Sequence, residues 1–337
     1  YWFHLTAEQR VKVNIVVMSV ATLGALLNFL VIVAMACDPL KILRKGPWVT
    51  ILNLAVADVI SSVSFVCVWG AHMFFPNQVS NVFYGVTFFS WMFGVSASFL
   101  FLTFLTVQIF LITKFPLRKR YCFTTLEIVL LCFGVWLFAI PMGLCRIAYL
   151  VFSLNTNLKI WAAQIGVLQL AVLIQIFLNI QVIAEIIRSG RASGNTENTK
   201  HRNIAKTVVI LTLILFITAF PYFILKQIEY FVRLGYLGKG TTATTLFAIN
   251  YCFTPIAALN FTANPILYSL RLPQYRKTLL AMIGKRGSGS RKRSFQTTSP
   301  SKLTNAFSLQ SQRTSITSPR RLSSERSSML QNTEQLM

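Results

Sequence analysis

The stretch QIFLITKFPLRKRY, residues 108–121, contains the kind of border on which the fold depends. An uncharged run that begins at residue 82 ends inside this stretch at residue 113, and Lys114, Arg118, Lys119 and Arg120 follow it. The uncharged run is long enough for a helix that crosses a lipid bilayer, which needs about 20 apolar residues. The border therefore predicts the end of a membrane-spanning helix and the start of a basic loop.

The composition of the whole chain also favours a membrane protein. Of the 337 residues, 54% are hydrophobic and only 12% are charged, whereas a soluble domain usually carries about 25% charged residues. The net charge of +23 would suit a protein that binds nucleic acid. The basic residues lie between and after apolar runs, however, so we predict anionic membrane lipids as their partners and no nucleic acid.

Seven runs of low charge recur along the chain, and each is long enough to span a bilayer. Only the second run contains acidic, basic or histidine side chains, which are Asp58 and His72. The core of a soluble protein of this length would not contain seven such runs, so we predict an all-α membrane protein with a seven-transmembrane helix bundle. The runs are residues 13–36, 48–75, 82–113, 128–145, 160–184, 207–225 and 241–270.

The Lys and Arg residues indicate the orientation of the bundle. Of these 32 residues, 25 lie on the side that holds the loop after residue 113, and 7 lie on the side of residue 1. Because basic loops stay in the cytoplasm, we expect residues 1–12 to be extracellular. Residues 284–337 are rich in Ser, Thr and Arg and predict a disordered cytoplasmic tail. Ser294 and Ser323 follow basic clusters there and are candidate phosphorylation sites.

Polar residues inside the runs mark a candidate functional centre. Asp58, in LNLAVADVI at 52–60, is costly in a membrane and needs partners. Candidate partners are Asn28, Ser98, Asn260 and Asn264. Their oxygens, with those of Asp58, suit a hard cation such as sodium. The alternative is a protonated Asp58 that bonds the same side chains without an ion.

Two prolines inside the sixth and seventh runs predict kinks. Pro221 lies in TAFPYF and Pro265 in NPILY, and each removes a backbone donor from its helix. We expect Asn264, directly before Pro265, to serve the carbonyl that this proline leaves free. Kinked helices around a polar centre favour rigid-body switching.

These features, in this order, resemble the rhodopsin-like (class A) G-protein-coupled receptors. The likeness covers about residues 13–283 and implies a short amphipathic eighth helix along the inner membrane face. It also implies a sodium pocket at Asp58, Ser98, Asn260 and Asn264. The motifs that carry it are Asn28, LAVAD at 54–58, Trp136 with Pro141, Pro221, NPILY at 264–268, FPLRKRY at 115–121 and RLPQYRKTL at 271–279.

The activation motifs of that family are altered. Gln108, Ile109 and Phe110 stand where the family has an acid, an arginine and a tyrosine. In the family, the arginine bonds an acidic residue on the sixth helix in the inactive state, but the matching neighbourhood here holds His201 and Arg202 and no acid. In the active state it approaches a tyrosine of the fifth helix, and the fifth run here has no tyrosine. The remaining switch positions implied by the resemblance are Ala219, in place of tryptophan, Pro221, Asn264, Pro265 and Tyr268.

The outer loops depart from the family too. Tyr84 stands where a disulfide cysteine is expected, residues 146–159 contain no cysteine, and the fifth run has no proline. These three features resemble the group of melanocortin, lysophospholipid, cannabinoid and adenosine receptors. Cys67, Cys145 and Cys252 lie in outer halves of their runs and could pair, although we expect free thiols.

The outer half of the bundle is where the family binds ligands. Trp91 replaces the aspartate that binds amines, and Ala258 stands where a retinal lysine would be, so the resemblance disfavours both ligands. Lys226 could bind a carboxylate or phosphate, or could only extend toward the membrane surface. Trp91 could instead be a packing residue, the more frequent role of such a tryptophan. The candidate pocket residues are His72, Trp91, Gln164, Lys226, Glu229 and Asn250.

The sequence therefore predicts a plasma-membrane receptor that converts binding of an extracellular ligand into a helix rearrangement read by heterotrimeric G proteins. The altered motif at 108–110 leaves a second hypothesis open, a receptor that does not couple to G proteins and acts as a decoy or through arrestin. A transporter or channel is disfavoured because the chain shows no internal repeat. No nucleotide-binding or hydrolase motif is present, so we predict no enzyme and no cofactor other than sodium.

Overall fold

The computed structural model describes residues 6–43, 46–75, 78, 80–115, 123–189, 196–237 and 240–287. The chain divides into two units, Tyr1–Gly289 and Ser290–Met337, and only the first contains described residues. Ser294 and Ser323 therefore lie outside the described residues, as does most of the loop at 115–121.

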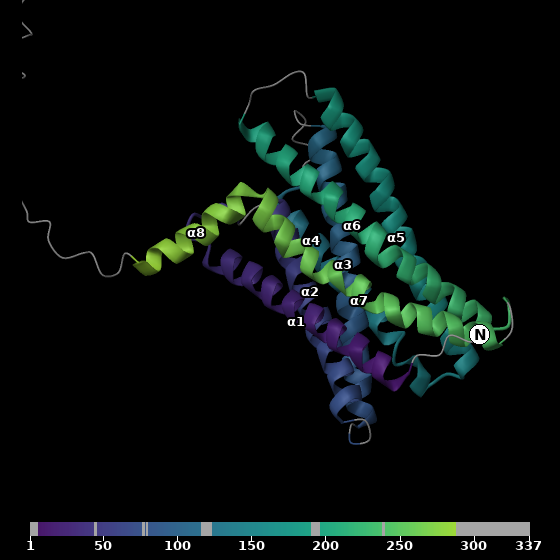
Figure 1. The fold of residues 1–337 in the computed structure, drawn as a ribbon. Helices are drawn as coiled ribbons and strands as arrows, with labels where there is room; N and C mark the ends of the chain where they lie inside the picture. The colour runs from purple at the N-terminus through teal and green to yellow at the C-terminus, as the bar shows by residue number, and fades with distance from the viewer. Residues whose placement is uncertain are drawn as a thin grey trace, which may run out of the picture. The chain divides into compact units, whose positions relative to one another are not determined.

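Within these residues the secondary structure is entirely helical (Figure 1). The elements are α1 (Ala7–Cys37), α2 (Pro47–Phe74), α3 (Asn81–Lys114), α4 (Thr125–Leu144), the 3-10 turn η2 (Ala148–Leu150), α5 (Leu154–Ser189), α6 (Thr196–Arg233), α7 (Gly240–Arg271) and α8 (Pro273–Gly287).

The seven predicted spans are confirmed. In the part of the chain that the structure describes, the helices α1 to α7 are long and apolar enough to cross a membrane. Several extend beyond the uncharged runs; α6 begins at Thr196, whereas its run begins at residue 207. The reason is that an apolar run marks only the part of a helix inside the hydrocarbon layer.

Side chains at the start of several helices satisfy the free backbone donors there. Thr6 and Gln9 form a reciprocal capping box at α1, and Thr124 and Glu127 form another at α4. Ser80 caps α3 by accepting a hydrogen bond from the backbone N–H of Phe83 at 3.2 Å. Each such cap satisfies donors that a helix start leaves unpaired, so the local sequence specifies these starts.

Six of the long helices, α3 among them, form a closed ring. Neighbouring pairs pack in the order α1, α2, α3, α5, α6, α7 and back to α1, while α4 packs on α2 and α3. In the apolar 18-residue stretch of α3, 61% of the residues are buried inside the bundle, against 28% in the corresponding stretches of α1, α4 and α5. The helix α3 contacts α2, α4, α5 and α6, which accounts for its high burial.

The outward faces of the bundle carry large apolar side chains. Leu26, Phe29, Phe133 and Phe177 are all at least 59% exposed to the surroundings of the isolated chain. Such continuous apolar surface is unfavourable in water and favourable in lipid. The faces therefore agree with a chain that crosses the membrane several times.

The predicted eighth helix is confirmed as α8, which turns away from the end of α7 (Figure 1). The Tyr275 ring is buried and meets the Tyr268 ring edge-on, with 6.5 Å between centroids. Burial raises the pKa of Tyr275 to about 12, so its hydroxyl stays protonated at physiological pH. This ring contact fixes the start of α8 against the end of α7.

Candidate functional site

A large cavity opens among the helices at the end of the bundle where α1 begins. Its volume is about 940 Å³, within the range of binding sites for small molecules. Residues from α1, α2, α3, α5, α6 and α7 line it, and so does Arg146 from the turn after α4. Its walls are mainly aromatic and basic. We refer to it as the outer cavity.

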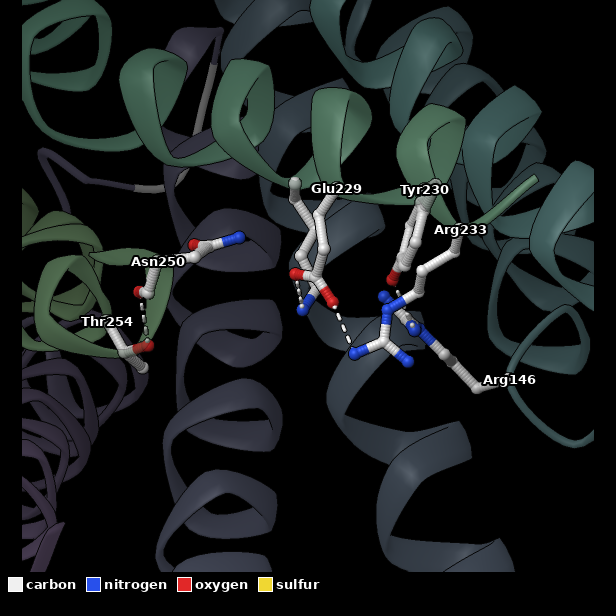
Figure 2. Close-up of polar contacts among 7 residues, drawn as sticks. Arg146, Glu229, Tyr230, Arg233, Asn250 and Thr254 are labelled. Carbon is white, nitrogen blue, oxygen red and sulfur yellow. Dashed lines mark hydrogen bonds and ion pairs between the residues drawn. The ribbon is translucent and has the colours of Figure 1, made fainter. Parts of the chain in front are cut away.

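A buried carboxylate organises one wall of the outer cavity. Glu229 is only 1% exposed. It binds Lys226 at 2.8 Å and Arg233 at 3.0 Å, each one helical turn away on α6. Figure 2 shows the contact with Arg233. The Lys226 ammonium also lies 5.5 Å from the centres of the Tyr230 and Phe247 rings. Two of the predicted pocket residues, Lys226 and Glu229, are therefore partners of each other.

Arg146 enters the outer cavity between two tryptophans. Its guanidinium lies 5.1 Å from the centre of the Trp161 ring and 5.9 Å from that of Trp91. It donates a hydrogen bond to the Tyr230 hydroxyl at 3.2 Å (Figure 2). Its Nε atom is buried without a partner. Among the described residues, no carboxylate forms an ion pair with it.

Arg146 is not among the pocket residues predicted from the sequence. There it contributes only to the count of Lys and Arg residues that indicates the orientation of the bundle. The signal in the sequence was its position directly after the apolar run at 128–145, which ends in a turn rather than a long loop. The next helical element, η2, begins two residues later.

Asn250 on α7 presents an unsatisfied amide to the same cavity. The residue is 2% exposed, and neither Nδ2 nor Oδ1 has a hydrogen-bond partner. Its backbone carbonyl accepts a bond from Thr254 Oγ1 at 3.2 Å, whereas the side chain extends into the space facing Glu229 (Figure 2). Buried polar atoms of this kind need an explanation, such as a bound ligand or water.

The other predicted pocket residues differ in position. Trp91 lines the cavity and packs against Phe65 and Phe88, with ring centroids 5.1 and 6.2 Å away. Gln164 does not line it, because its amide donates to the backbone carbonyl of Met142 on α4 at 2.7 Å. His72 lies on α2, and its side chain is outside the described part of the structure.

A smaller cavity of about 50 Å³ adjoins the outer one and reaches deeper into the bundle. The two share Trp91, Arg146, Tyr222, Lys226 and Thr254. The rest of the lining of this deep cavity is largely apolar. The small residues Ala219 on α6 and Ala257 and Ala258 on α7 are part of its wall.

The predicted polar centre lies around Asp58. Its two carboxylate oxygens accept hydrogen bonds from Ser98 Oγ and Asn264 Nδ2, both at 2.6 Å. Asp58 is fully buried. Asn264 Oδ1 is also buried and has no partner. The structure thus brings α2, α3 and α7 together at three of the four predicted residues, while the fourth, Asn260, is buried and lines the deep cavity.

This donor set fits a sodium ion. Carboxylate, hydroxyl and amide oxygens are the ligands that hard cations prefer, and the free Asn264 Oδ1 atom is an available ligand. Asp58, Ser98 and Asn264 would hold the ion, which would supply the positive charge that a buried carboxylate lacks. Sodium binding stays a prediction.

One expectation about the kink in α7 is wrong. Pro265 removes the donor that would bind the carbonyl of Phe261. Asn28 Nδ2 on α1 bonds this carbonyl at 2.7 Å, while the Asn264 amide is used by Asp58. The freed carbonyl therefore joins α7 to α1, because the Asn264 amide group already donates to Asp58.

Comparison with known proteins agrees with this geometry. Residues 27–268 match the family described as "7 transmembrane receptor (rhodopsin family)".

The chain belongs to the rhodopsin family of seven-transmembrane receptors.

Three relatives illustrate how distant the similarity is. Human lysophosphatidic acid receptor 4 is 22% identical over 79% of this chain and 76% of its own length. The mouse receptor of the same name is 21% identical over 70% of this chain and 68% of its own length. A purinoceptor of Xenopus laevis is 31% identical, over 32% of this chain and 20% of its own length.

Family membership confirms several predictions. The protein is a multi-pass membrane receptor that responds to a ligand, and the family is not one of enzymes. Two of the relatives are named for lysophosphatidic acid, and lysophospholipid receptors were part of the predicted sub-family likeness. The described cysteines of this receptor, Cys37, Cys67, Cys132, Cys145 and Cys252, are free.

At the other end of α3, the switch residues 108–110 of the receptor are uncharged. Gln108 is 2% exposed, and its Oε1 atom accepts a hydrogen bond from Thr50 on α2 at 3.0 Å. Ile109 is buried in the core, and Phe110 is half-buried with the Lys114 ammonium 5.0 Å from its ring centre. A neutral bond between α2 and α3 therefore occupies the position of the family's charged motif.

The remaining switch residues lie along α6 and α7. Ala219 faces the deep cavity, and Pro221 and Pro265 are inside their helices. Tyr268 is buried with its hydroxyl unpaired. The structure also contains a second proline in α7, Pro255, which was not among the predicted kink positions.

Proposed function

We propose that this protein is a plasma-membrane receptor whose extracellular ligand binds in the outer cavity and whose helices report binding to heterotrimeric G proteins. The observation that carries the proposal is the cavity of about 940 Å³, lined by six of the spans. A ligand there touches helices that also meet at Asp58. Such a ligand shifts the equilibrium between the inactive and active arrangements of the helices only if it binds one arrangement more tightly than the other.

The charge distribution supports the orientation that this function needs. The outer cavity lies at the end of the bundle where α1 begins, and the side of residue 1 holds 7 of the 32 basic residues. The positive-inside rule then puts the cavity outside the cell and the end at Gln108 inside. The names of the relatives, a lysophosphatidic acid receptor and a purinoceptor, support a small extracellular ligand.

A second function is favoured by one observation, the buried Ile109 where the family's arginine would be. A receptor without this arginine lacks a contact that faces the G protein. It would then act as a decoy or recruit arrestin. The bonded centre at Asp58 and Asn264 supports the signalling hypothesis instead.

One experiment separates the two functions. The full chain is expressed in cells, and constitutive and ligand-stimulated G-protein activation is measured beside arrestin recruitment. We expect G-protein activation. Arrestin recruitment without any G-protein activation would contradict the first proposal and support the second.

Ile109→Arg is the companion variant. It restores the missing charge, and we predict that G-protein activation rises severalfold at equal surface expression. The control is Leu126→Arg, which adds the same charge near the same membrane face at a side chain that is 69% exposed. Equal activation by Ile109→Arg and the unmodified receptor would show that position 109 does not limit coupling.

A further inference from the structure

The outer cavity contains more basic groups than its own acid can neutralise. Arg10, Arg146, Lys226 and Arg233 line it, and Glu229 is the one carboxylate among the described residues of its lining. Lys226 and Arg233 share that carboxylate. Arg146, held between two indole rings, has no acidic partner in the described part of the chain. Such a cavity attracts an anion.

Two side chains in the cavity also have hydrogen-bonding capacity left over. Arg146 Nε is buried without an acceptor, and Asn250 has both amide atoms buried without partners at 2% exposure. A guanidinium and an amide N–H₂ both donate to oxygen. The oxygens of a carboxylate or phosphate would accept hydrogen bonds from Arg146 Nε and Asn250 Nδ2, the two donors of this set. This points to a compact oxyanion as the head of the ligand.

The deep cavity is suited to a different part of the ligand. Ala219, Ala257 and Ala258 leave space there, and Phe99, Ile165 and Phe261 complete an apolar wall. Its volume of about 50 Å³ accommodates a chain of a few carbon atoms. A polar group such as a nucleotide base would lose its hydrogen bonds to water in this cavity. The deep cavity, whose lining shares Arg146 with the outer cavity, therefore favours an apolar chain.

We propose that the ligand is a single-chain amphiphile whose oxyanion head binds Arg146 and Asn250 in the outer cavity and whose apolar chain enters the deep cavity beside Ala219. This inference rests on the proposed function, since it identifies the ligand class of the same site.

The test is direct binding to the purified full chain, with probes that separate head from chain. A series of n-alkyl phosphates from butyl to dodecyl is compared with inorganic phosphate, n-octanol and uridine triphosphate, and octanoate tests the carboxylate head. We expect saturable binding of octyl phosphate or octanoate, with affinity rising about fourfold per buried methylene until the deep cavity is full. Whichever of octyl phosphate and octanoate binds more tightly identifies the head group as a phosphate or a carboxylate.

Other binding patterns would overturn the proposal. Octanol binding as tightly as octyl phosphate would show that the charge is not recognised. Inorganic phosphate or uridine triphosphate binding as tightly would show that the chain is not recognised. Failure of every alkyl anion to bind would exclude the ligand class.

Variants of the head site provide a second measurement. Arg146→Gln should weaken octyl phosphate at least tenfold, because a charge-assisted hydrogen bond is lost. Arg146→Lys keeps a cation between the tryptophans and is the variant to use if Arg146→Gln folds poorly. It should still weaken binding of octyl phosphate severalfold, because lysine lacks the planar guanidinium that donates several hydrogen bonds in a fixed geometry. Lys159→Gln is the matched control, because Lys159 is exposed and does not line the cavity. Unchanged affinity in both Arg146 variants would overturn the proposal.

Ala219→Leu tests the chain site. The larger side chain fills the deep cavity, so the rise in affinity with chain length should stop at a shorter chain than in the unmodified receptor. A misfolded variant would lose all probes alike, and its thermal melting curve would show it. An unchanged chain-length profile in a folded Ala219→Leu variant would overturn the proposal.

Signalling measured with the same probes separates this inference from the proposed function. Binding of octyl phosphate without G-protein or arrestin response would contradict the proposed function and leave the ligand class intact. Activation through the cavity by a neutral or purely polar probe would contradict the ligand class and leave the function intact.

Discussion

Single polar side chains in apolar helices decide where the functional centres of this receptor lie. Asp58, Asn264 and Gln108 are each nearly inaccessible, yet each is bonded across two helices. A polar group without a partner in such surroundings would cost several kcal/mol, on the order of 2–7. The bonds to Asp58, Asn264 and Gln108 offset part of this cost, and each of them joins two helices.

The first prediction at this scale concerns sodium at Asp58. Sodium should raise the melting temperature of the unmodified receptor relative to potassium by a few degrees, about 1.4 kcal/mol when sodium is at tenfold its dissociation constant. Asp58→Asn should abolish this dependence, because the amide carries no charge. The measurement is thermal unfolding of the purified receptor in each salt. Glu8→Gln removes an exposed carboxylate on α1 and serves as control; equal sodium stabilisation of all three proteins would exclude the site.

At the scale of the helices, missing backbone donors and missing side chains help to decide which helices pack together. Pro265 deprives α7 of one donor, and α1 supplies the missing bond through Asn28. Gly94 on α3 has no side chain at the point where α3 approaches α2. Trp136 Nε1 on α4 donates to Asn53 Oδ1 on α2 at 2.9 Å. These local gaps and bonds specify which helix faces pair.

The bond between α1 and α7 predicts a coupled effect. Asn28→Ala should destabilise the receptor by about 1–3 kcal/mol, since the Phe261 carbonyl is left without a donor. Pro265→Ala restores a backbone N–H that can bond this carbonyl within α7. In that background, Asn28→Ala should therefore cost clearly less. Melting temperatures of the four proteins in the double-mutant cycle test this, and strictly additive effects would contradict it.

The close approach of α2 and α3 predicts a strict requirement for glycine. A Cβ atom on Gly94 would lie 2.8 Å from the backbone nitrogen of Ser61 and 2.9 Å from the carbonyl oxygen of Ala57. Gly94→Ala should destabilise the receptor by about 1–3 kcal/mol, because backbone atoms must move. Gly134→Ala on α4 meets nothing within 4 Å and should be neutral or slightly stabilising. Equal melting temperatures for the two variants would show that the helices can separate without cost.

At the scale of the whole molecule, the helix α3 takes part in all the sites described above. The outer cavity, the deep cavity and the Asp58 centre all include residues of α3. At its other end α3 bonds α2 through Gln108 and Thr50. A ligand that moves α3 or α6 can therefore affect both ends of the bundle, as rigid-body switching requires.

The orientation of the whole molecule is a separate prediction. An epitope placed before residue 6 should be accessible to antibody on intact cells, and one placed after residue 337 only after permeabilisation. The reason is the excess of Lys and Arg on the C-terminal side, which stays in the cytoplasm. Flow cytometry of both tagged proteins measures this. Staining of the C-terminal epitope on intact cells would reverse the proposed position of the outer cavity.

The sequence by itself determined the number of spans, the eighth helix, the family and the positions of the main polar residues. These follow from local properties, because the length of an apolar run, a helix cap or a proline acts within a few residues of itself. The motif around Asp58 was recognisable for the same reason, and three of its predicted members do meet in the structure.

Only the tertiary structure decided which side chains meet across helices. Asn28 rather than Asn264 bonds the Phe261 carbonyl, Gln164 bonds α4 instead of lining the outer cavity, and Arg146 enters that cavity although no motif predicts it. Each outcome depends on how far a helix is rotated and how closely its neighbour packs. That rotation is a compromise among all contacts of the bundle, so no single stretch of the chain contains it.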